Sequence, residues 1–266
     1  MIIPENILSV LKNHKYKRDN FVNKTKYFYG SDSEDMWEKK VKENRKNYYI
    51  NNPIEYKFNN FGYRTYDDFK KDKKGIVTLG CSFTEGIGLH LENTWSYKIA
   101  KYLDKPFYNL AVGGSGIRDS FERLISFGDY LNFDYVFLLV PPIGRVSNYF
   151  GDNEIVKNVF SIDQYVNFLP HSSIDNELVK WQRIIFNGSR YEEKFYEFTF
   201  LNLIYFYLKS KNKKLIYFKS SDVNQWFNHQ DVSKIKCEDI ESRDGHWGSI
   251  KQHYIFELFR SQYDNR

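Results

Sequence analysis

Cysteine and long apolar runs are both scarce in this chain, and each absence excludes a class of protein. The two cysteines, Cys81 and Cys237, are too few to indicate a disulfide framework. No stretch approaches the roughly 20 consecutive apolar residues that a membrane-spanning helix needs. Residues 1–6 lack the basic region and the long apolar core of a secretion signal. We therefore expect a protein of the cytoplasm that has no membrane partner.

A strong excess of charge of one sign is also missing. The formal net charge is +5, and acidic and basic residues are interspersed. Lysines gather at 70–74 and at 209–214, where each group flanks a predicted strand, so solvated lysines at strand ends are the ordinary interpretation. A nucleic-acid-binding protein would combine a basic face with a recognisable reader module. The sequence contains no such module, and we expect no nucleic-acid partner.

The chain is organised around residues 75–88. Ile76 to Leu79 is a short apolar run rich in β-branched residues, which predicts a buried strand. Ser82 follows on a tight loop in which Gly86 and Gly88 allow sharp backbone turns. Apolar residues then recur at helical spacing, at Trp95, Ile99, Ala100 and Leu103. A strand, a glycine-rich loop and a helix in this order place the loop at the carboxyl edge of a parallel sheet.

Three further strands are predicted, at 106–110, 135–140 and 214–218. The run at 135–140 is apolar throughout, as a central parallel strand covered on both faces should be. Helical spacing appears after 116, over 191–208 and after 249. This alternation predicts a three-layer α/β/α sandwich with a mainly parallel, flavodoxin-like sheet. The loops that carry Ser82, Gly114, Arg145 and the pair Asp244 and His246 then all open at one edge of it.

The rest of the chain is assigned to two less regular parts. Residues 1–56 are polar and aromatic, with weak helical patterns at 7–11 and 36–41, and we expect an N-terminal extension packed on a domain of residues 57–266. Residues 146–190 have no strong period. An insertion over the edge of the site is one interpretation of this stretch, and ordinary packing by an aromatic-rich chain is the other.

Four motifs resemble those of the SGNH (GDSL-type) hydrolases, over about residues 57–262. The run Gly80-Cys-Ser-Phe-Thr-Glu-Gly86 resembles their first block, with Cys81 where the pattern has aspartate. The run Asn60-Phe-Gly-Tyr-Arg64 resembles a segment that often precedes this block. Asn109 with the glycine-rich loop after it resembles the second block, and Asp244-Gly-His246 before the last helix resembles the fifth.

The resemblance implies a role for each of these residues. Ser82 is the expected nucleophile, His246 its base and Asp244 the carboxylate that orients the base. The amides of Ser82 and Gly114 are the expected oxyanion donors. The family's asparagine donor is replaced by Ile143, and Arg145 is the nearest residue that could compensate.

Each residue also has a plainer interpretation. Ser82 could cap or turn a helix, Asp244-Gly-His246 could be a turn, and Arg145 could form a surface salt bridge. Cys81 beside Ser82 could be a reactive thiol, although a small buried filler is the ordinary expectation. Ser249 is the expected cap of the last helix.

Together these patterns predict a serine esterase that works through an acyl-enzyme, and the resemblance implies an acylated carbohydrate as substrate. An O-acyltransferase of the same fold and a non-catalytic binding or structural module are the alternatives. We expect a small-molecule or glycan ester as partner, with no cofactor and no metal. The oligomeric state is left open.

Overall fold

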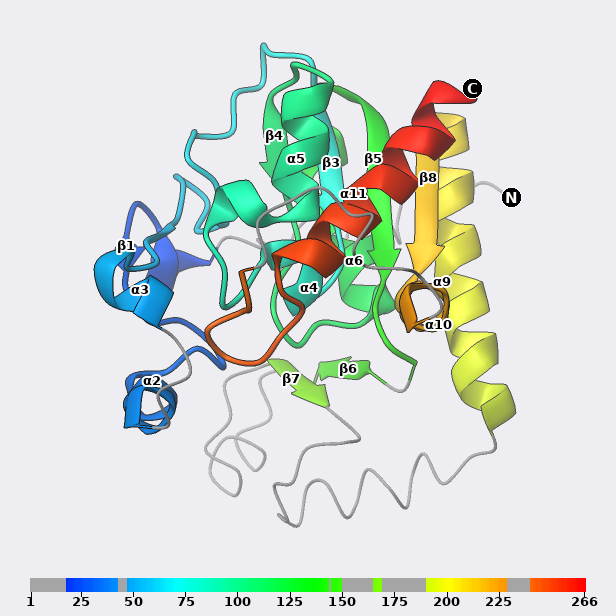
Figure 1. Ribbon diagram of the computed structural model, residues 1–266. Coiled ribbons are helices and arrows are strands. Elements are labelled where there is room, and N and C mark those ends of the chain that lie inside the picture. Colours follow the sequence, from blue (N-terminus) through cyan, green and yellow to red (C-terminus); the bar gives the residue numbers. More distant parts are fainter. Residues whose placement is uncertain (1–17, 43–46, 144, 150–164, 169–189, 229–239) are drawn as a thin grey trace.

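A four-stranded parallel sheet forms the centre of the protein (Figure 1). The computed structural model describes residues 18–42, 47–143, 145–149, 165–168, 190–228 and 240–266. The sheet has the strand order β4-β3-β5-β8, and its strands are β3 (Gly75–Leu79), β4 (Phe107–Asn109), β5 (Phe133–Val140) and β8 (Lys214–Lys219). Every neighbouring pair is parallel. The four predicted strands are confirmed, with ends that differ by one or two residues.

The sheet is apolar on both faces because its strands alternate between two cores. In β5, Val136 and Leu138 belong to one buried cluster, and Phe137 and Leu139 belong to the other. Successive side chains of a strand point to opposite faces, so an unbroken apolar run is what a strand covered on both sides requires. The apolar run that predicted this strand therefore also indicates that the strand is buried on both faces.

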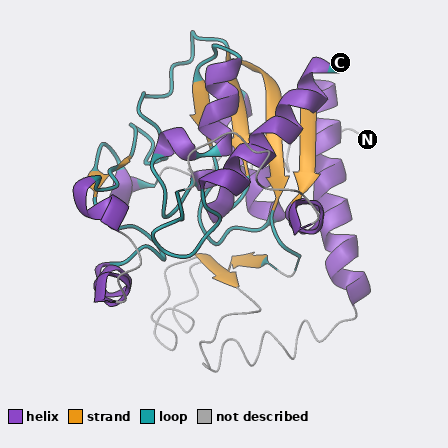
Figure 2. Cartoon of the chain, in the orientation of Figure 1, coloured by secondary structure: helices purple, strands orange, loops and turns teal. Residues whose placement is uncertain are grey.

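Helices cover both faces and complete three layers (Figure 2). One buried cluster joins the sheet to α6 (Ile117–Gly128) and α9 (Arg190–Ser210). The other joins it to α5 (Trp95–Tyr102), α10 (Ser220–Asn228) and α11 (Ser249–Asp264). The predicted α/β/α sandwich is confirmed.

The start of α11 corrects one detail of the sequence analysis. Gly248, not Ser249, is the N-cap, and Ser249 is the first helical residue. The hydroxyl of Ser249 accepts a hydrogen bond from the amide of Ile240, at 2.7 Å. The side chain therefore ties the preceding loop to the helix instead of capping the helix.

The remaining elements are short and lie outside the central sheet. The N-terminal part contains η1 (Asp19–Phe21), β1 (Thr25–Lys26), α2 (Glu34–Lys42), α3 (Asn47–Asn51) and β2 (Tyr56–Lys57). The loops after β3 contain α4 (Ser82–Glu85) and η2 (Leu91–Asn93). Strands β6 (Val146–Tyr149) and β7 (Tyr165–Phe168) pair antiparallel. The predicted helical pattern at 7–11, and the expected insertion apart from these two strands and its last residue, lie outside the described residues.

Candidate active site

Ser82 lies at the start of the short helix α4, three residues beyond the end of β3. The N-cap of α4 is Cys81, and Ser82 is the first residue of the helix. The interpretation of Ser82 as a helix cap is therefore wrong. Its hydroxyl oxygen instead lies 2.9 Å from Nε2 of His246, although the two residues are 164 positions apart in the chain. Cys81 is buried, as expected of a small filler.

Asp244 holds the other side of the histidine ring. Its Oδ2 lies 2.5 Å from Nδ1 of His246. The other carboxylate oxygen, Oδ1, accepts from the His246 amide at 3.1 Å and from the Ser242 hydroxyl at 3.2 Å. Gly245 between the two residues has a φ of +90°, which lets the chain turn tightly enough for aspartate and histidine to meet. We call Ser82, Asp244 and His246 together the Ser82 site.

The carboxyl group of Asp244 is strongly biased towards its ionised form. Burial disfavours the charge, but the hydrogen bonds and charge of His246, with a hydrogen bond from Ser31, outweigh it and hold the pKa of Asp244 well below its usual range. An ionised carboxylate against Nδ1 fixes the ring with its proton on Nδ1 and its lone pair on Nε2, facing Ser82.

Gly88 makes room for this carboxylate. Its φ is +82°, and a Cβ built on it would overlap Oδ1 of Asp244. The carbonyl of Gly88 also accepts from the amide of Arg243 at 2.7 Å, which joins the loop after β3 to the loop before α11. The glycine predicted to allow a turn is thus also the point where the two loops touch.

Arg64 braces the loop that carries Ser82. The side chain is buried, and its guanidinium donates to the carbonyls of Glu85, Gly86 and Leu89. These bonds hold the backbone of residues 85–89, at the end of α4 and just after it.

An aromatic wall flanks the histidine. The Phe83 ring lies edge-on to His246, with centroids 5.4 Å apart, and stacks on Trp247 at 3.8 Å. The carbonyl of Phe83 accepts from the buried side chain of Gln252 in α11, at 3.0 Å. The side chain of His246 retains 22% exposure, so its imidazole is reachable from solvent, whereas the side chain of Asp244 is fully buried.

The glycine-rich loop after β4 lies beside Ser82. A Cβ built on Gly113 would be 3.8 Å from Cβ of Ser82. Oε2 of the fully buried Glu85 accepts from the amide of Gly113, at 2.5 Å. Among the described residues, no acceptor is bonded to the amides of Ser82 and Gly114. These two amides are the predicted oxyanion donors, and their role remains a prediction.

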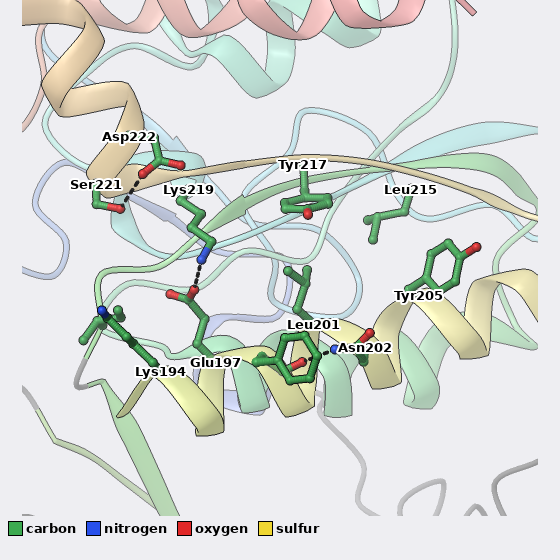
Figure 3. A pocket seen from close by; sticks show the side chains of 12 residues that line it. Lys194, Glu197, Leu201, Asn202, Tyr205, Leu215, Tyr217, Lys219, Ser221 and Asp222 are labelled. Atoms are coloured by element: carbon green, nitrogen blue, oxygen red, sulfur yellow. Dashed lines mark hydrogen bonds and ion pairs between the residues drawn. The ribbon is translucent and has the colours of Figure 1, made fainter. Parts of the chain in front are cut away.

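Ile143 and Arg145 are two residues apart in the loop after β5, but they lie against different elements. Ile143 lines a cavity of about 770 Å³ between β8 and α9, on whose walls lie Glu197, Tyr217 and Lys219 (Figure 3). Arg145 lies against Gly116, at the start of α6. Its Nη1 is buried. Among the described residues, this atom has neither a hydrogen-bond partner nor a carboxylate partner. Within the described residues the expected surface salt bridge is not found, and the proposed oxyanion role remains a prediction.

Sequence reasoning missed the contribution of residues 18–32, which we call the N-terminal segment. Ser31 donates to Oδ2 of Asp244 at 2.6 Å. Arg18 and Tyr29 both bond Oε1 of Glu85, at 3.0 and 2.8 Å. No periodicity marks these residues, and the only local signal is the turn-forming run Gly30-Ser31-Asp32-Ser33.

Two absences apply to the described part of the chain. None of its helices combines the length and the apolar character that crossing a bilayer requires. Within the same residues, no three histidine, cysteine, aspartate or glutamate side chains gather as a metal site would need.

Comparisons with known proteins add little to the geometry. No family model matches the chain, and no curated protein does. Among solved structures, the chain is similar to one from Desulfitobacterium hafniense DCB-2 that is named a "putative lipolytic protein of G-D-S-L family". The two share 14% identity over 70% of this chain and 97% of that chain, with a TM-score of 0.30. A likeness this distant carries no argument about activity.

Proposed function

We propose that the protein is a serine hydrolase that cleaves acyl esters through an acyl-enzyme. The observation that carries the proposal is the Ser82 site itself, in which Ser82 Oγ lies 2.9 Å from His246 Nε2 and His246 Nδ1 lies 2.5 Å from Asp244 Oδ2. A serine hydroxyl is a weak nucleophile until a base removes its proton, and this arrangement supplies both the base and the group that orients it.

The proposed reaction has two matching halves. Ser82 Oγ attacks the ester carbonyl carbon while His246 Nε2 takes the hydroxyl proton, and the carbonyl oxygen becomes an oxyanion. The intermediate collapses, the C–O bond of the ester breaks, and the alcohol leaves with the proton from His246. Water then repeats the sequence on the acyl-serine and releases the acid. Asp244 stays ionised throughout and stabilises the imidazolium.

The oxyanion needs donors aimed at its position. We assign the amides of Ser82 and Gly114 to this task, supported by the approach of the Gly113 backbone to Ser82. Arg145 is proposed as a third donor in place of the missing asparagine, supported by the unpartnered buried Nη1.

The proposed substrate class is an acylated carbohydrate, and its only support is the family resemblance. An O-acyltransferase shares every step up to the acyl-serine and differs in accepting a sugar hydroxyl instead of water. A non-catalytic module is disfavoured by the pairing of a nucleophile, a base and a buried carboxylate in one place.

A fluorophosphonate probe followed by peptide mass spectrometry tests the proposal. We expect the label on Ser82, no label in Ser82→Ala and an unchanged label in Cys81→Ala. Folded wild-type protein that takes up no label would contradict the enzyme assignment. Release of acyl groups from an ester, measured with and without added glycan acceptors, then separates the hydrolase from the transferase.

A further inference from the structure

The N-terminal segment places one hydroxyl on the carboxylate of the Ser82 site. Ser31 Oγ donates to Oδ2 of Asp244 at 2.6 Å, and this is the same oxygen that lies 2.5 Å from Nδ1 of His246. The other oxygen, Oδ1, accepts from the Ser242 hydroxyl and the His246 amide, so both carboxylate oxygens accept hydrogen bonds. Ser31 is 213 residues away from Asp244 in the chain.

The position of Ser31 is fixed by contacts other than its own. It lies in a tight turn closed by backbone hydrogen bonds between Tyr29 and Asp32, in both directions. Asp32 is buried and forms an ion pair with Arg243, the residue before Asp244, with a shortest distance of 2.5 Å. The hydroxyl of Tyr56 donates to Asp32 at 2.5 Å. The turn is therefore anchored to the loop that carries Asp244.

A hydroxyl in this position affects the carboxylate in two ways. It restricts rotation of the carboxylate, so that Oδ2 stays directed at His246. It also stabilises the ionised form of Asp244, which the imidazolium of the proposed reaction needs. Neither effect requires contact with substrate.

We propose that Ser31 is a positioning residue for the reaction of the Ser82 site, acting through Asp244 on the orientation of His246. The proposal rests on the proposed function, since it assigns Ser31 a part in that reaction. It means that the N-terminal segment completes the active site.

Replacing Ser31 by alanine tests this inference, with Ser33→Ala as the matched control. Ser33 is two residues away. Its hydroxyl accepts from the amide of Met36, at 3.2 Å, and among the described residues no hydrogen bond joins it to Asp244. We expect Ser31→Ala to lower kcat about tenfold, as loss of a hydrogen bond to a charged group can do, with little change in KM. Ser31→Thr, which retains a hydroxyl, should restore most of the rate.

A second readout does not depend on turnover. The proton shared by His246 Nδ1 and Asp244 should give a low-field proton NMR resonance that disappears in His246→Ala. We expect it to move in Ser31→Ala and to stay in place in Ser33→Ala and Ser31→Thr. Equal kcat in Ser31→Ala and Ser33→Ala, or a resonance at the same position in both, would overturn the inference. Failure of the proposed function is seen separately, as absence of probe labelling in the wild type.

Discussion

Two regions meet at the Ser82 site, and different interactions dominate the way each is held. The carboxyl edge of the sheet supplies Ser82 and the Gly113–Gly114 loop, whose positions follow from strands held in a two-sided apolar core. The N-terminal segment has little regular structure. Phe21 and Tyr29 pack on a smaller apolar cluster, and two ion pairs, Arg18 with Glu85 and Asp32 with Arg243, join the segment to the loops of the site. The first region places the groups that would react, and the second contacts the groups behind them.

The two kinds of interaction fix different features of the site. Burial of apolar side chains is non-directional and fixes the strands without specifying any single polar contact. Buried ion pairs are directional and costly to break, so a few of them can set the orientation of one carboxylate. Substitutions of the reacting groups should therefore lower kcat, whereas breaking an ion pair of the N-terminal segment should lower the free energy of unfolding.

Ser82→Ala should cause the largest loss. Removing the nucleophile of a serine hydrolase lowers kcat by about 10⁴–10⁶-fold, while the fold should be retained because one hydroxyl is removed without adding volume. Ester hydrolysis and the thermal unfolding midpoint measure the two effects. Cys81→Ala is the control and should keep its activity. An inactive Cys81→Ala together with an active Ser82→Ala would show that Ser82 is not the nucleophile.

Asp244→Asn should cost about 10⁴ in kcat at neutral pH, because an asparagine amide no longer fixes the ring proton on Nδ1 of His246. His246→Ala should cost at least as much, since it removes the base itself. Steady-state kinetics of both variants provide the measurement. Wild-type kcat in Asp244→Asn would remove Asp244 from the proposed mechanism, and the N-terminal segment would lose its connection to the reaction.

The predictability of these residues from sequence follows the same division. The strand at 76–79 and the loop after it are visible because buried parallel strands leave continuous apolar runs. Asp244 and His246 are visible because they are neighbours in a short motif before a helix. Ser31 leaves no such trace: its hydrogen bond to Asp244 spans 213 residues, and a lone serine in a turn is chemically ordinary.

The loop after β5 shows a second limit of sequence reasoning. Ile143 stands where the motif of the SGNH hydrolases, which the loop was compared with, has an asparagine, and in the structure Ile143 lines the cavity beside α9. Sequence position alone could identify the missing donor. It could not show that Nη1 of Arg145 would be buried without a partner, since that depends on how the loop meets α6.

Glu85→Gln tests whether the N-terminal segment is held by its ion pair. Glu85 is fully buried. Its neutral replacement removes the carboxylate that pairs with Arg18 among the described residues, while the side chain of Arg18 is only 16% exposed. We expect the free energy of unfolding to fall by about 3–5 kcal/mol, as in other broken buried pairs. Urea denaturation measures this change.

Two further variants sharpen the Glu85 test. Glu92→Gln makes the same substitution at an exposed carboxylate that accepts from Tyr66, and it should change the free energy of unfolding little. The double variant Arg18→Met with Glu85→Gln should be more stable than Glu85→Gln alone, because no unpaired charge remains. If Glu85→Gln is as stable as the wild type, polar pairs do not hold the segment and the contrast between the two regions fails.

Arg145→Ala should have the smallest of these effects. It tests whether a positive charge stabilises the oxyanion in addition to the amides of Ser82 and Gly114. Among the described residues nothing pairs with Nη1 of Arg145, although this atom is buried. If the oxyanion is its partner, the variant should lose about 10²–10³ in kcat with little change in KM, the usual cost of one oxyanion donor. Arg145→Lys should recover only part of the rate, since an ammonium lacks the fixed fork of a guanidinium. A raised KM with unchanged kcat would instead make Arg145 a binding residue for an anionic substrate group. Unchanged kcat and KM would leave the amides of Ser82 and Gly114 as the only proposed donors and would favour a weaker enzyme or the non-catalytic alternative.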